Sequence, residues 1–199
     1  MSTTTSTNLT STTNPSLTPY TTTPTSYLTA NPTITHLVVG ALILHNNNRV
    51  LLIQRAPRDG FGLKWECPGG CVDTTADPSI VHALVREVRE ETGLEVEGCV
   101  RGVVDALEFE GGKGSRWRKI TFLVVLDGHC EGKGEDGREL PPVVRLSEEE
   151  HVGAVWAGEG DVVDGRVGGR EIQFAYDAQR ETILEVFRKV RDGGGSGTE

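Results

Sequence analysis

Residues 86–94 read Arg-Glu-Val-Arg-Glu-Glu-Thr-Gly-Leu, a stretch that predicts a helix with crowded carboxylates. At about 100° per residue, Glu87, Glu90 and Glu91 fall within one sector of roughly 100°. Like charges at these spacings destabilise a helix and raise one another's pKa values, so the sector requires a cation. Hard oxygen ligands suit Mg²⁺ or Mn²⁺ and leave coordination positions for substrate phosphates. The stretch predicts a metal–phosphate site; the simpler alternative is a solvated charged face on a surface helix.

The residues around this stretch predict a helix over residues 78–92. Asp77 is placed to cap its N-terminus, Pro78 suits the first turn, and Gly93 suits the end. Apolar residues recur at helical spacing and predict a buried stripe, formed by Ile80, Leu84 and Val88. Two of the three carboxylates, Glu87 and Glu91, lie beside this stripe, at the edge of the core, where an unpaired charge is costly.

Working outward, apolar runs between turn residues predict strands on both sides of the helix. These runs are residues 37–44, 50–53, 100–109, 120–126 and 143–146. The first two flank three asparagines and predict a hairpin, and the 100–109 and 120–126 strands are expected to pair antiparallel. A last helix over about residues 172–191 is expected to cover a sheet face. Periodicity alone indicates an α+β or α/β fold.

Composition predicts one domain with tails. The chain has 199 residues and a net charge of −9, which favours a divalent cation over nucleic acid as a partner. No apolar run approaches the roughly 18 residues that a membrane helix requires. Of the first 30 residues, 18 are Ser or Thr and none is charged, so residues 1–33 are predicted to be a disordered tail, and deletion of residues 1–30 is expected to have little effect. Residues 34–191 form the predicted domain and residues 192–199 a flexible tail.

The cysteines indicate a reducing compartment. Cys67, Cys71, Cys99 and Cys130 show neither the repeated close pairs of a zinc site nor the density of a disulfide scaffold. The N-terminus has no basic and apolar export signal. We therefore expect reduced thiols and a cytoplasmic location, with the nucleus as the alternative.

Residues 86–94 resemble the second half of the signature of the Nudix hydrolases. That signature is a glycine, five residues, a glutamate, seven residues, then Arg-Glu-apolar-any-Glu-Glu-any-Gly-apolar, and residues 86–94 fit every specified position of its second half. Residues 65–70, Trp-Glu-Cys-Pro-Gly-Gly, are similar to the segment that precedes the signature, and the resemblance covers about residues 36–190. The first half departs, because Gly70 lies 16 residues before Arg86 instead of 14 and Pro78 replaces the first glutamate.

The resemblance implies a fold and a metal site. The fold is a Nudix-like α/β/α sandwich with a mixed β-sheet between helices, the carboxylate helix on one face and the C-terminal helix on the other. Glu90 and Glu91 would be metal ligands, Glu87 a further ligand or the base, and the Gly69 carbonyl would complete the shell around Mg²⁺ or Mn²⁺. In the family the first glutamate helps to hold Arg86, so Asp77 or Asp73 would have to take its place.

Other positions are candidates for catalysis or substrate binding. In this superfamily the base is a signature glutamate or a glutamate from a later loop, and among Glu148, Glu149 and Glu150 we favour Glu150, which precedes His151. A solvated acidic turn is the alternative for that loop. Gly70 would let backbone approach a phosphate, Arg55 would meet a phosphate, and Trp65 would stack on a base. Each has a simpler interpretation: Gly70 would only form a turn, Arg55 would pair with an acidic side chain, and Trp65 would be a core residue. The five histidines show no ligand spacing.

The predicted reaction is metal-dependent hydrolysis of a phosphoanhydride bond. The expected partner is a small-molecule nucleoside diphosphate linked to another moiety, such as ADP-ribose, a dinucleotide, a sugar nucleotide or an oxidised nucleoside triphosphate. Specificity is expected in the loops 56–64, 111–119, 128–140 and 158–170. The alternative function is a non-catalytic nucleotide-sensing module on the same fold, which the missing first glutamate favours. A homodimer is left open.

Overall fold

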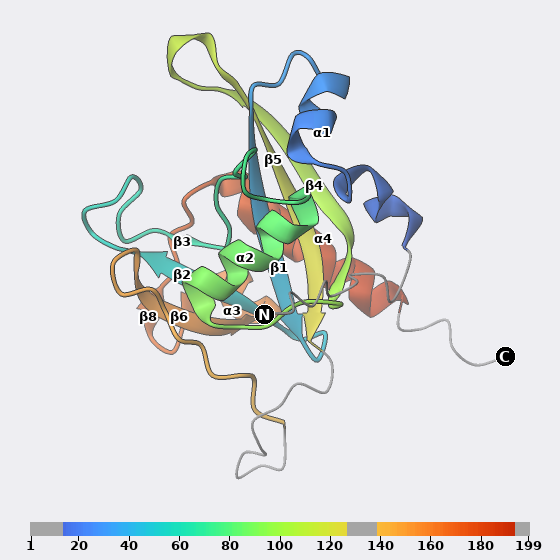
Figure 1. Ribbon diagram of the computed structural model, residues 1–199. Helices are drawn as coiled ribbons and strands as arrows, with labels where there is room; N and C mark the ends of the chain where they lie inside the picture. Colours follow the sequence, from blue (N-terminus) through green and yellow to red (C-terminus); the bar gives the residue numbers. More distant parts are fainter. Residues whose placement is uncertain (1–13, 127–138, 194–199) are drawn as a thin grey trace, which may run out of the picture.

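The computed structural model describes residues 14–126 and 139–193 (Figure 1). Its helices are η1 (Pro15–Tyr20), α1 (Pro24–Ala30), α2 (Ile80–Thr92), η2 (Gly112–Gly114), α3 (Glu159–Asp164) and α4 (Asp177–Gly193). Its strands are β1 (His36–His45), β2 (Arg49–Arg55), β3 (Trp65–Glu66), β4 (Val100–Glu110), β5 (Arg116–Leu126), β6 (His151–Gly158), β7 (Arg166–Val167) and β8 (Arg170–Glu171). Most of the predicted loop 128–140, Cys130 and most of the predicted tail 192–199 lie outside the described residues.

The sheet that carries the fold is mixed. Its strand order is β3-β2-β1-β5-β4, with β6 also paired to β2. β1 and β5 run parallel from the pair His36 and Trp117 to the pair His45 and Leu126, whereas the other pairs in this sheet are antiparallel. The predicted antiparallel pairing of residues 100–109 with 120–126 is therefore confirmed. A parallel pair at the centre needs both faces covered, which explains the near-continuous apolar sequence of β1.

The β1–β2 hairpin forms where the three asparagines predicted it. Asn46 and Asn47 both have positive φ angles, 47° and 56°, a conformation that asparagine tolerates better than most residues. The two strands pair at His45 and Arg49, directly outside this turn, and next at Leu44 and Val50. The turn chemistry therefore sets the register of the first hairpin.

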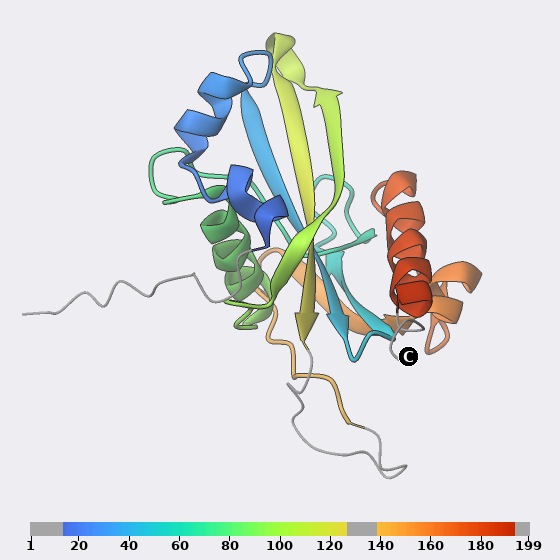
Figure 2. The same cartoon turned by 90° about the vertical axis from the view of Figure 1, so that its right-hand side faces the viewer.

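Helices cover both faces of the sheet. In Figure 2, α2 and the N-terminal helices lie on one side of the sheet and α4 lies on the other. Two apolar clusters fill these two interfaces. The first contains the predicted stripe of α2, and the second contains Ile183 and Phe187 of α4. The predicted α/β/α sandwich is confirmed. Among the described residues, no helix is long and apolar enough to cross a membrane.

The N-terminal segment differs from its prediction. Residues 15–20 and 24–30 are helical and pack on the first apolar cluster through Leu17, Tyr20, Tyr27 and Leu28. The Tyr20 ring lies edge-on to Phe122 of β5, with 5.3 Å between ring centroids. Disorder over residues 1–33 is thus wrong for the described part, because a few apolar side chains among the Ser and Thr residues suffice once a sheet face is available.

Two helix boundaries also differ. α2 begins at Ile80, two residues later than predicted, because Ser79 and not Asp77 caps it: the Ser79 hydroxyl accepts a hydrogen bond from the His82 backbone N–H at 3.2 Å. The predicted end is confirmed, since Gly93 adopts φ 68°. The last helix begins at Asp177, later than the predicted residue 172.

The region before α4 contains the remaining differences. Residues 143–146 form no strand; instead the Arg145 N–H donates to the Thr92 carbonyl at 2.8 Å and ties this segment to the end of α2. The strand that does form is β6, which no prediction assigned. α3 occupies part of the predicted loop 158–170.

Candidate active site

One cavity of about 1120 Å³ lies where α2, the sheet and the start of α4 meet. The residues that line it come from segments far apart in the sequence. On the side of α2 they include Glu66, Gly69, Gly70, Glu87, Glu91 and Glu150. This side collects most of the predicted catalytic and metal-binding residues.

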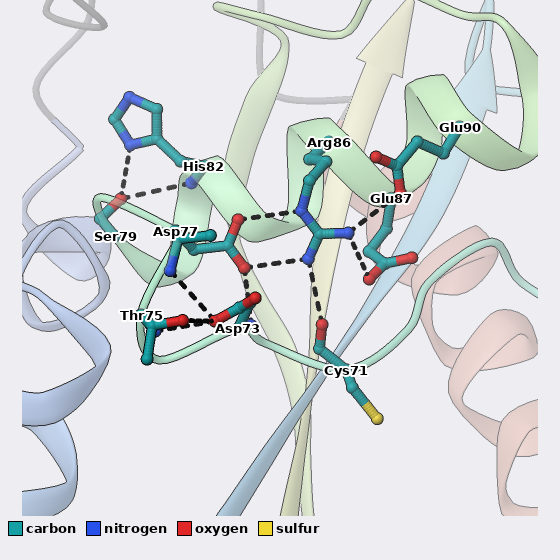
Figure 3. Close-up of polar contacts among 10 residues, drawn as sticks. Cys71, Asp73, Thr75, Asp77, Ser79, His82, Arg86, Glu87 and Glu90 are labelled. Atoms are coloured by element: carbon teal, nitrogen blue, oxygen red, sulfur yellow. Dashed lines mark hydrogen bonds and ion pairs between the residues drawn. The ribbon is translucent and has the colours of Figure 1, made fainter.

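Arg86 is held by a set of hydrogen bonds on the outer side of α2 (Figure 3). Its Nε and Nη2 donate to the two carboxylate oxygens of Asp77, each at 2.9 Å, and Nη2 also donates to the Cys71 carbonyl at 3.1 Å. Nη1 donates to Glu87 at 2.8 Å and to Glu90 at 3.0 Å. Although burial opposes it, the Arg86 guanidinium holds the pKa of the Asp77 carboxyl below its usual range.

Asp77, rather than Asp73, therefore occupies the place of the missing glutamate. Asp73 supports it: the Asp73 N–H donates to Asp77 at 2.8 Å, and the Asp73 carboxylate accepts from the Thr75 and Ala76 N–H groups in the same turn. The turn absorbs the two extra residues that separate Gly70 from Arg86. The short aspartate side chain reaches Arg86 because helix α2 starts after it.

Glu91 is the most buried carboxylate of the helix, with 5% of its surface exposed. One oxygen accepts a hydrogen bond from the Gly69 N–H at 2.6 Å. Burial raises the pKa of Glu91 to about 8, against that hydrogen bond, and the nearby charges of Glu66, Glu87 and Glu150 raise it further. Such a carboxylate is stabilised in its ionised form by a cation.

Glu87 lies beside Gly70. Burial raises its pKa above the usual value, despite the contact with Arg86. A Cβ atom at Gly70 would come within 2.5 Å of the Glu87 carboxylate, so the absence of a side chain at this glycine makes room for the glutamate. Glu90 differs from the other two: its side chain is 55% exposed, it pairs with Arg86, and it is not among the residues that line the cavity.

Gly69 is fixed against the sheet. It has φ 150°, and a Cβ atom there would collide with the Val39 carbonyl of β1. The carbonyls on either side of it, those of Pro68 and Gly70, accept hydrogen bonds from Ala41 and Val39 at 2.7 and 2.9 Å. The role of the Gly69 carbonyl as a metal ligand stays a prediction.

The 147–151 turn brings a second group to the cavity. The Glu150 carbonyl accepts from the Ala56 N–H at 2.8 Å, which fixes the backbone next to β2. Ligand atoms of Glu91, Glu150 and His151 all lie within 4.8 Å of one another. No ligand spacing marks His151 in the sequence, because its neighbour Glu91 is 60 residues away and only the fold brings the two together.

Two predicted substrate contacts are placed differently. Arg55 lines the cavity, but its guanidinium is paired with Asp59 and Glu66 and its Nε donates to the Gly60 carbonyl at 2.8 Å, so the simpler interpretation of a pair with an acid is confirmed. Trp65 is 1% exposed, packs in the second apolar cluster and donates from Nε1 to the Glu171 carbonyl at 3.1 Å. The prediction that Trp65 stacks on a base is wrong.

Another wall of the cavity comes from β4, β5, the start of α4 and the residue just before it, Tyr176. It offers apolar and polar side chains together, among them Leu107, Phe109, Lys119, Tyr176, Gln179 and Thr182. The Lys119 ammonium lies 5.0 Å from the centre of the Tyr176 ring. The loops in which specificity was expected do not include this wall, because nothing in the sequence of α4 distinguishes its first turn from that of a packing helix.

The donor set fits a divalent cation. Glu87, Glu91 and Glu150 offer carboxylate oxygens at the cavity, and His151 offers a buried ring nitrogen with no hydrogen-bond partner among the described residues. Without a cation, several carboxylates would face one another with little compensation at Glu91. The cavity is therefore suited to hold a metal ion together with the phosphates that the ion would bind.

Comparison with known proteins identifies the class. A family model described as NUDIX domain matches residues 34–182, most of the chain. The chain therefore belongs to the Nudix family, as the signature of residues 86–94 indicated.

Particular relatives share part of the chain. The chain is 35% identical over 91 residues to the 8-oxo-dGDP phosphatase NUDT18 of Danio rerio, a match covering 46% of this chain and 25% of that protein. It is 36% identical over 92 residues to the 8-oxo-dGTP diphosphatase of Proteus vulgaris, covering 46% of this chain and 76% of that one. The crystal structure of the MutT protein from Methanosarcina mazei Go1 superposes with a TM-score of 0.52 at 23% identity, covering 81% and 96% of the two chains. That likeness shows the fold.

Proposed function

We propose that this chain hydrolyses a phosphoanhydride bond in a nucleoside diphosphate derivative. The observation that carries the proposal is the convergence of Glu87, Glu91 and Glu150 on one large cavity, from two segments far apart in the sequence. Carboxylates gathered in this way are suited to bind a divalent ion together with phosphates, and they are not required for the packing of the helix. Membership of the Nudix family supports the same reaction class.

The metal proposed is Mg²⁺ or Mn²⁺, held by Glu87, Glu90, Glu91 and the Gly69 carbonyl. When bound, it would neutralise charge on the phosphates and lower the pKa of a water molecule. Glu90 would have to exchange its contact with Arg86 for the ion, since its carboxylate points away from the cavity lining. Arg86 acts through Glu87: by binding Asp77 and Glu87 together, it positions that carboxylate over Gly70.

Glu150 is the proposed general base. It is exposed, lines the cavity and lies in a turn fixed to Ala56, so it can take a proton from water and return it to solvent. Glu87 is the alternative base: burial raises its pKa, so it binds a proton more readily than an ordinary glutamate. Glu150→Gln distinguishes the two assignments: it should strongly lower turnover if Glu150 is the base, and much less if Glu87 is the base.

The second moiety of the substrate is proposed to occupy the wall formed by Leu107, Phe109 and Tyr176. The cavity of about 1120 Å³ exceeds the roughly 300–1,000 Å³ of most small-molecule sites, which favours a substrate larger than a phosphate ester. Exposed aromatic side chains suit a planar base. The names of the relatives place oxidised guanine nucleotides first in the panel to be tested.

The alternative, a nucleotide-sensing module without turnover, loses its main argument. It was favoured by the missing first glutamate, but Asp77 now makes the two hydrogen bonds that hold Arg86. The retention of buried, mutually repelling carboxylates also supports an enzyme.

The test is release of phosphate or nucleoside monophosphate from a panel that contains 8-oxo-dGDP, 8-oxo-dGTP, ADP-ribose, a dinucleotide and a sugar nucleotide. Each substrate is incubated with Mg²⁺, with Mn²⁺ and with excess chelator. Glu91→Gln should abolish metal-dependent release, whereas Glu185→Gln, an exposed carboxylate of α4, is the matched control. Nucleotide binding without release from any substrate would favour the sensing module instead.

Two further parts of the proposal rest on the sequence. A cytoplasmic location, with the nucleus as the alternative, follows from the cysteine pattern. Among the cysteines that the structure describes, Cys67 and Cys71 are free thiols, which is consistent with a reducing compartment. A homodimer would be tested by sedimentation of the full chain.

A further inference from the structure

His151 is a buried imidazole without a hydrogen-bond partner. Only 3% of its surface is exposed, and neither ring nitrogen makes a hydrogen bond within the part of the chain that the structure describes. A buried polar group left in this state costs free energy comparable to its full desolvation, of order 1–3 kcal/mol. An unsatisfied buried ring of this kind suggests that a ligand, such as a metal ion, binds to it.

The neighbours of the ring are carboxylates. His151 Nε2 lies 3.6 Å from Glu91 Oε1 and 3.9 Å from Glu66 Oε1, both too long for a hydrogen bond. Metal–ligand bonds of about 2.1 Å place two ligands of one ion roughly 3–4 Å apart. The spacing of Nε2 and Oε1 is therefore that of two ligands of one ion, and the Glu150 carboxylate lies within 4.8 Å of both.

The two carboxylates near the ring are not equivalent. Glu66 is already neutralised by its ion pair with Arg55. Glu91 uses one oxygen for the Gly69 N–H, which leaves Oε1, the oxygen nearest to His151, free for another ligand. Among the described residues, by contrast, Glu91 has no lysine or arginine partner.

The backbone holds His151 in this place. In the pairing of β2 with β6, Gln54 faces Gly153 and Arg55 faces His151, so Val152 is an extra residue of β6. This bulge sends the Val152 side chain to solvent, 51% exposed, while His151 points inward. The His151 N–H also donates to the Ser147 carbonyl at 2.9 Å. Bulges of this kind commonly re-aim a side chain next to a functional site.

We propose that His151 joins Glu91 and Glu150 as a nitrogen ligand of a divalent ion, and that this nitrogen makes the site prefer a transition metal such as Mn²⁺ to Mg²⁺. Imidazole nitrogen suits first-row transition metals, whereas Mg²⁺ prefers oxygen ligands in a near-ideal octahedron. The site rests on the proposed function and deepens it, because Glu91 belongs to both, and with Glu150 as a ligand it leaves Glu87 as the general base. Metal binding is measured without turnover, so its failure is distinguishable from failure of the hydrolase proposal.

The test is calorimetric titration of the chelator-treated full chain with Co²⁺ and, separately, with Mg²⁺. Wild-type protein should bind Co²⁺ more tightly than Mg²⁺. His151→Gln should weaken Co²⁺ binding by at least about tenfold, since even the outer partners of metal ligands are worth roughly 10- to 100-fold in affinity. The Mg²⁺ affinity should change much less. His36→Gln, an exposed histidine at the start of β1, is the control and should change neither affinity.

Two outcomes overturn the inference. One is an equal Co²⁺ affinity in the His151 and His36 variants, which would leave the buried ring as a structural partner of Glu91. The other comes from unmutated protein labelled with ¹⁵N-histidine: pulsed electron spin resonance of the Co²⁺ form should detect a bound histidine nitrogen, and its absence would exclude ligation. Because this second measurement uses no variant, it decides the case even where His151→Gln does not fold.

Discussion

Asp77 and Arg86 form a two-pronged ion pair across the turn that precedes α2, with both hydrogen bonds at 2.9 Å. Asp77 is buried, and its backbone N–H is bonded to the Asp73 carbonyl, so the carboxylate is fixed before the helix begins. The third guanidinium nitrogen of Arg86, Nη1, donates to the carboxylates of Glu87 and Glu90 on α2. By holding Arg86, Asp77 in the loop therefore also positions Glu87, which lines the cavity.

Asp77→Asn should lower kcat/KM while the protein still folds. The amide cannot accept both Arg86 hydrogen bonds, so Glu87 loses its fixed partner and activity should fall by about 10- to 100-fold, as for other residues that orient metal ligands. Steady-state kinetics on the substrate found in the panel would measure this. Asp73→Asn is the matched control, since its side chain bonds only within the turn, and an equal loss in both variants would contradict the special role of Asp77.

Glu91→Gln should make the metal-free protein more stable at alkaline pH while abolishing activity. The pKa of Glu91 is raised to about 8 from a usual 4.5, so the folded state binds this proton more tightly than the unfolded state. Its contribution to stability is therefore fully present below pH 4.5 and is lost as pH rises through about 8. Glutamine removes the charge and still accepts from Gly69.

Urea unfolding in chelator at pH 5 and pH 9 checks this expectation. The variant should gain free energy of unfolding relative to wild type at the higher pH and little at the lower. Glu185→Gln, whose carboxylate is exposed on α4, should show no such difference between the two pH values. A variant less stable than wild type at pH 9 would contradict the assignment.

Gly70→Ala should lower activity without destabilising the fold. The new methyl group would come within 2.5 Å of the Glu87 carboxylate, the far end of a flexible side chain, so the side chain moves and the backbone stays. We expect a nearly unchanged melting temperature and a clear loss of kcat. Gly69→Ala is the contrasting variant: its methyl group meets the Val39 backbone, and φ 150° is strained for alanine, so it should lower the melting temperature itself.

Deleting residues 1–33 should lower the melting temperature, contrary to the expectation from composition. The deletion removes the side chains that cover Phe122 and two acceptors of Arg118 Nη1, the Tyr27 hydroxyl and the Asn31 side-chain oxygen Oδ1, at 2.8 and 2.9 Å. Tyr20→Ala alone should cost about 1–3 kcal/mol, below the range for fully buried aromatic residues because Tyr20 is half-buried. Thermal unfolding measures both, with Val163→Ala, an exposed position, as the control.

Local sequence patterns were sufficient to predict part of this structure. The carboxylate helix, its apolar stripe and its end at Gly93 follow from helical spacing and from one left-handed glycine. The first hairpin follows from residues that tolerate positive φ. These features depend on neighbours a few residues apart, so a single sequence contains the information.

Other features depend on contacts that no local pattern contains. Asp77 looks like a helix cap until Arg86, nine residues on, takes its carboxylate and Ser79 caps the helix instead. Trp65 precedes a glycine-rich loop and resembles a binding residue, yet tertiary packing buries it. His151 acquires its neighbours only when β6 pairs with β2. Each of these outcomes is decided by the assembled fold.

The parallel pairing of β1 with β5 governs how the chain can fold. Each residue of β1 meets a partner 81 positions later, from His36 with Trp117 to His45 with Leu126. Closing so long a loop is entropically costly, and domains dominated by distant pairings fold slowly. During synthesis, the apolar β1 strand leaves the ribosome well before β5 exists. Until then it is an unpaired edge, and the nascent chain is most exposed to aggregation in that interval.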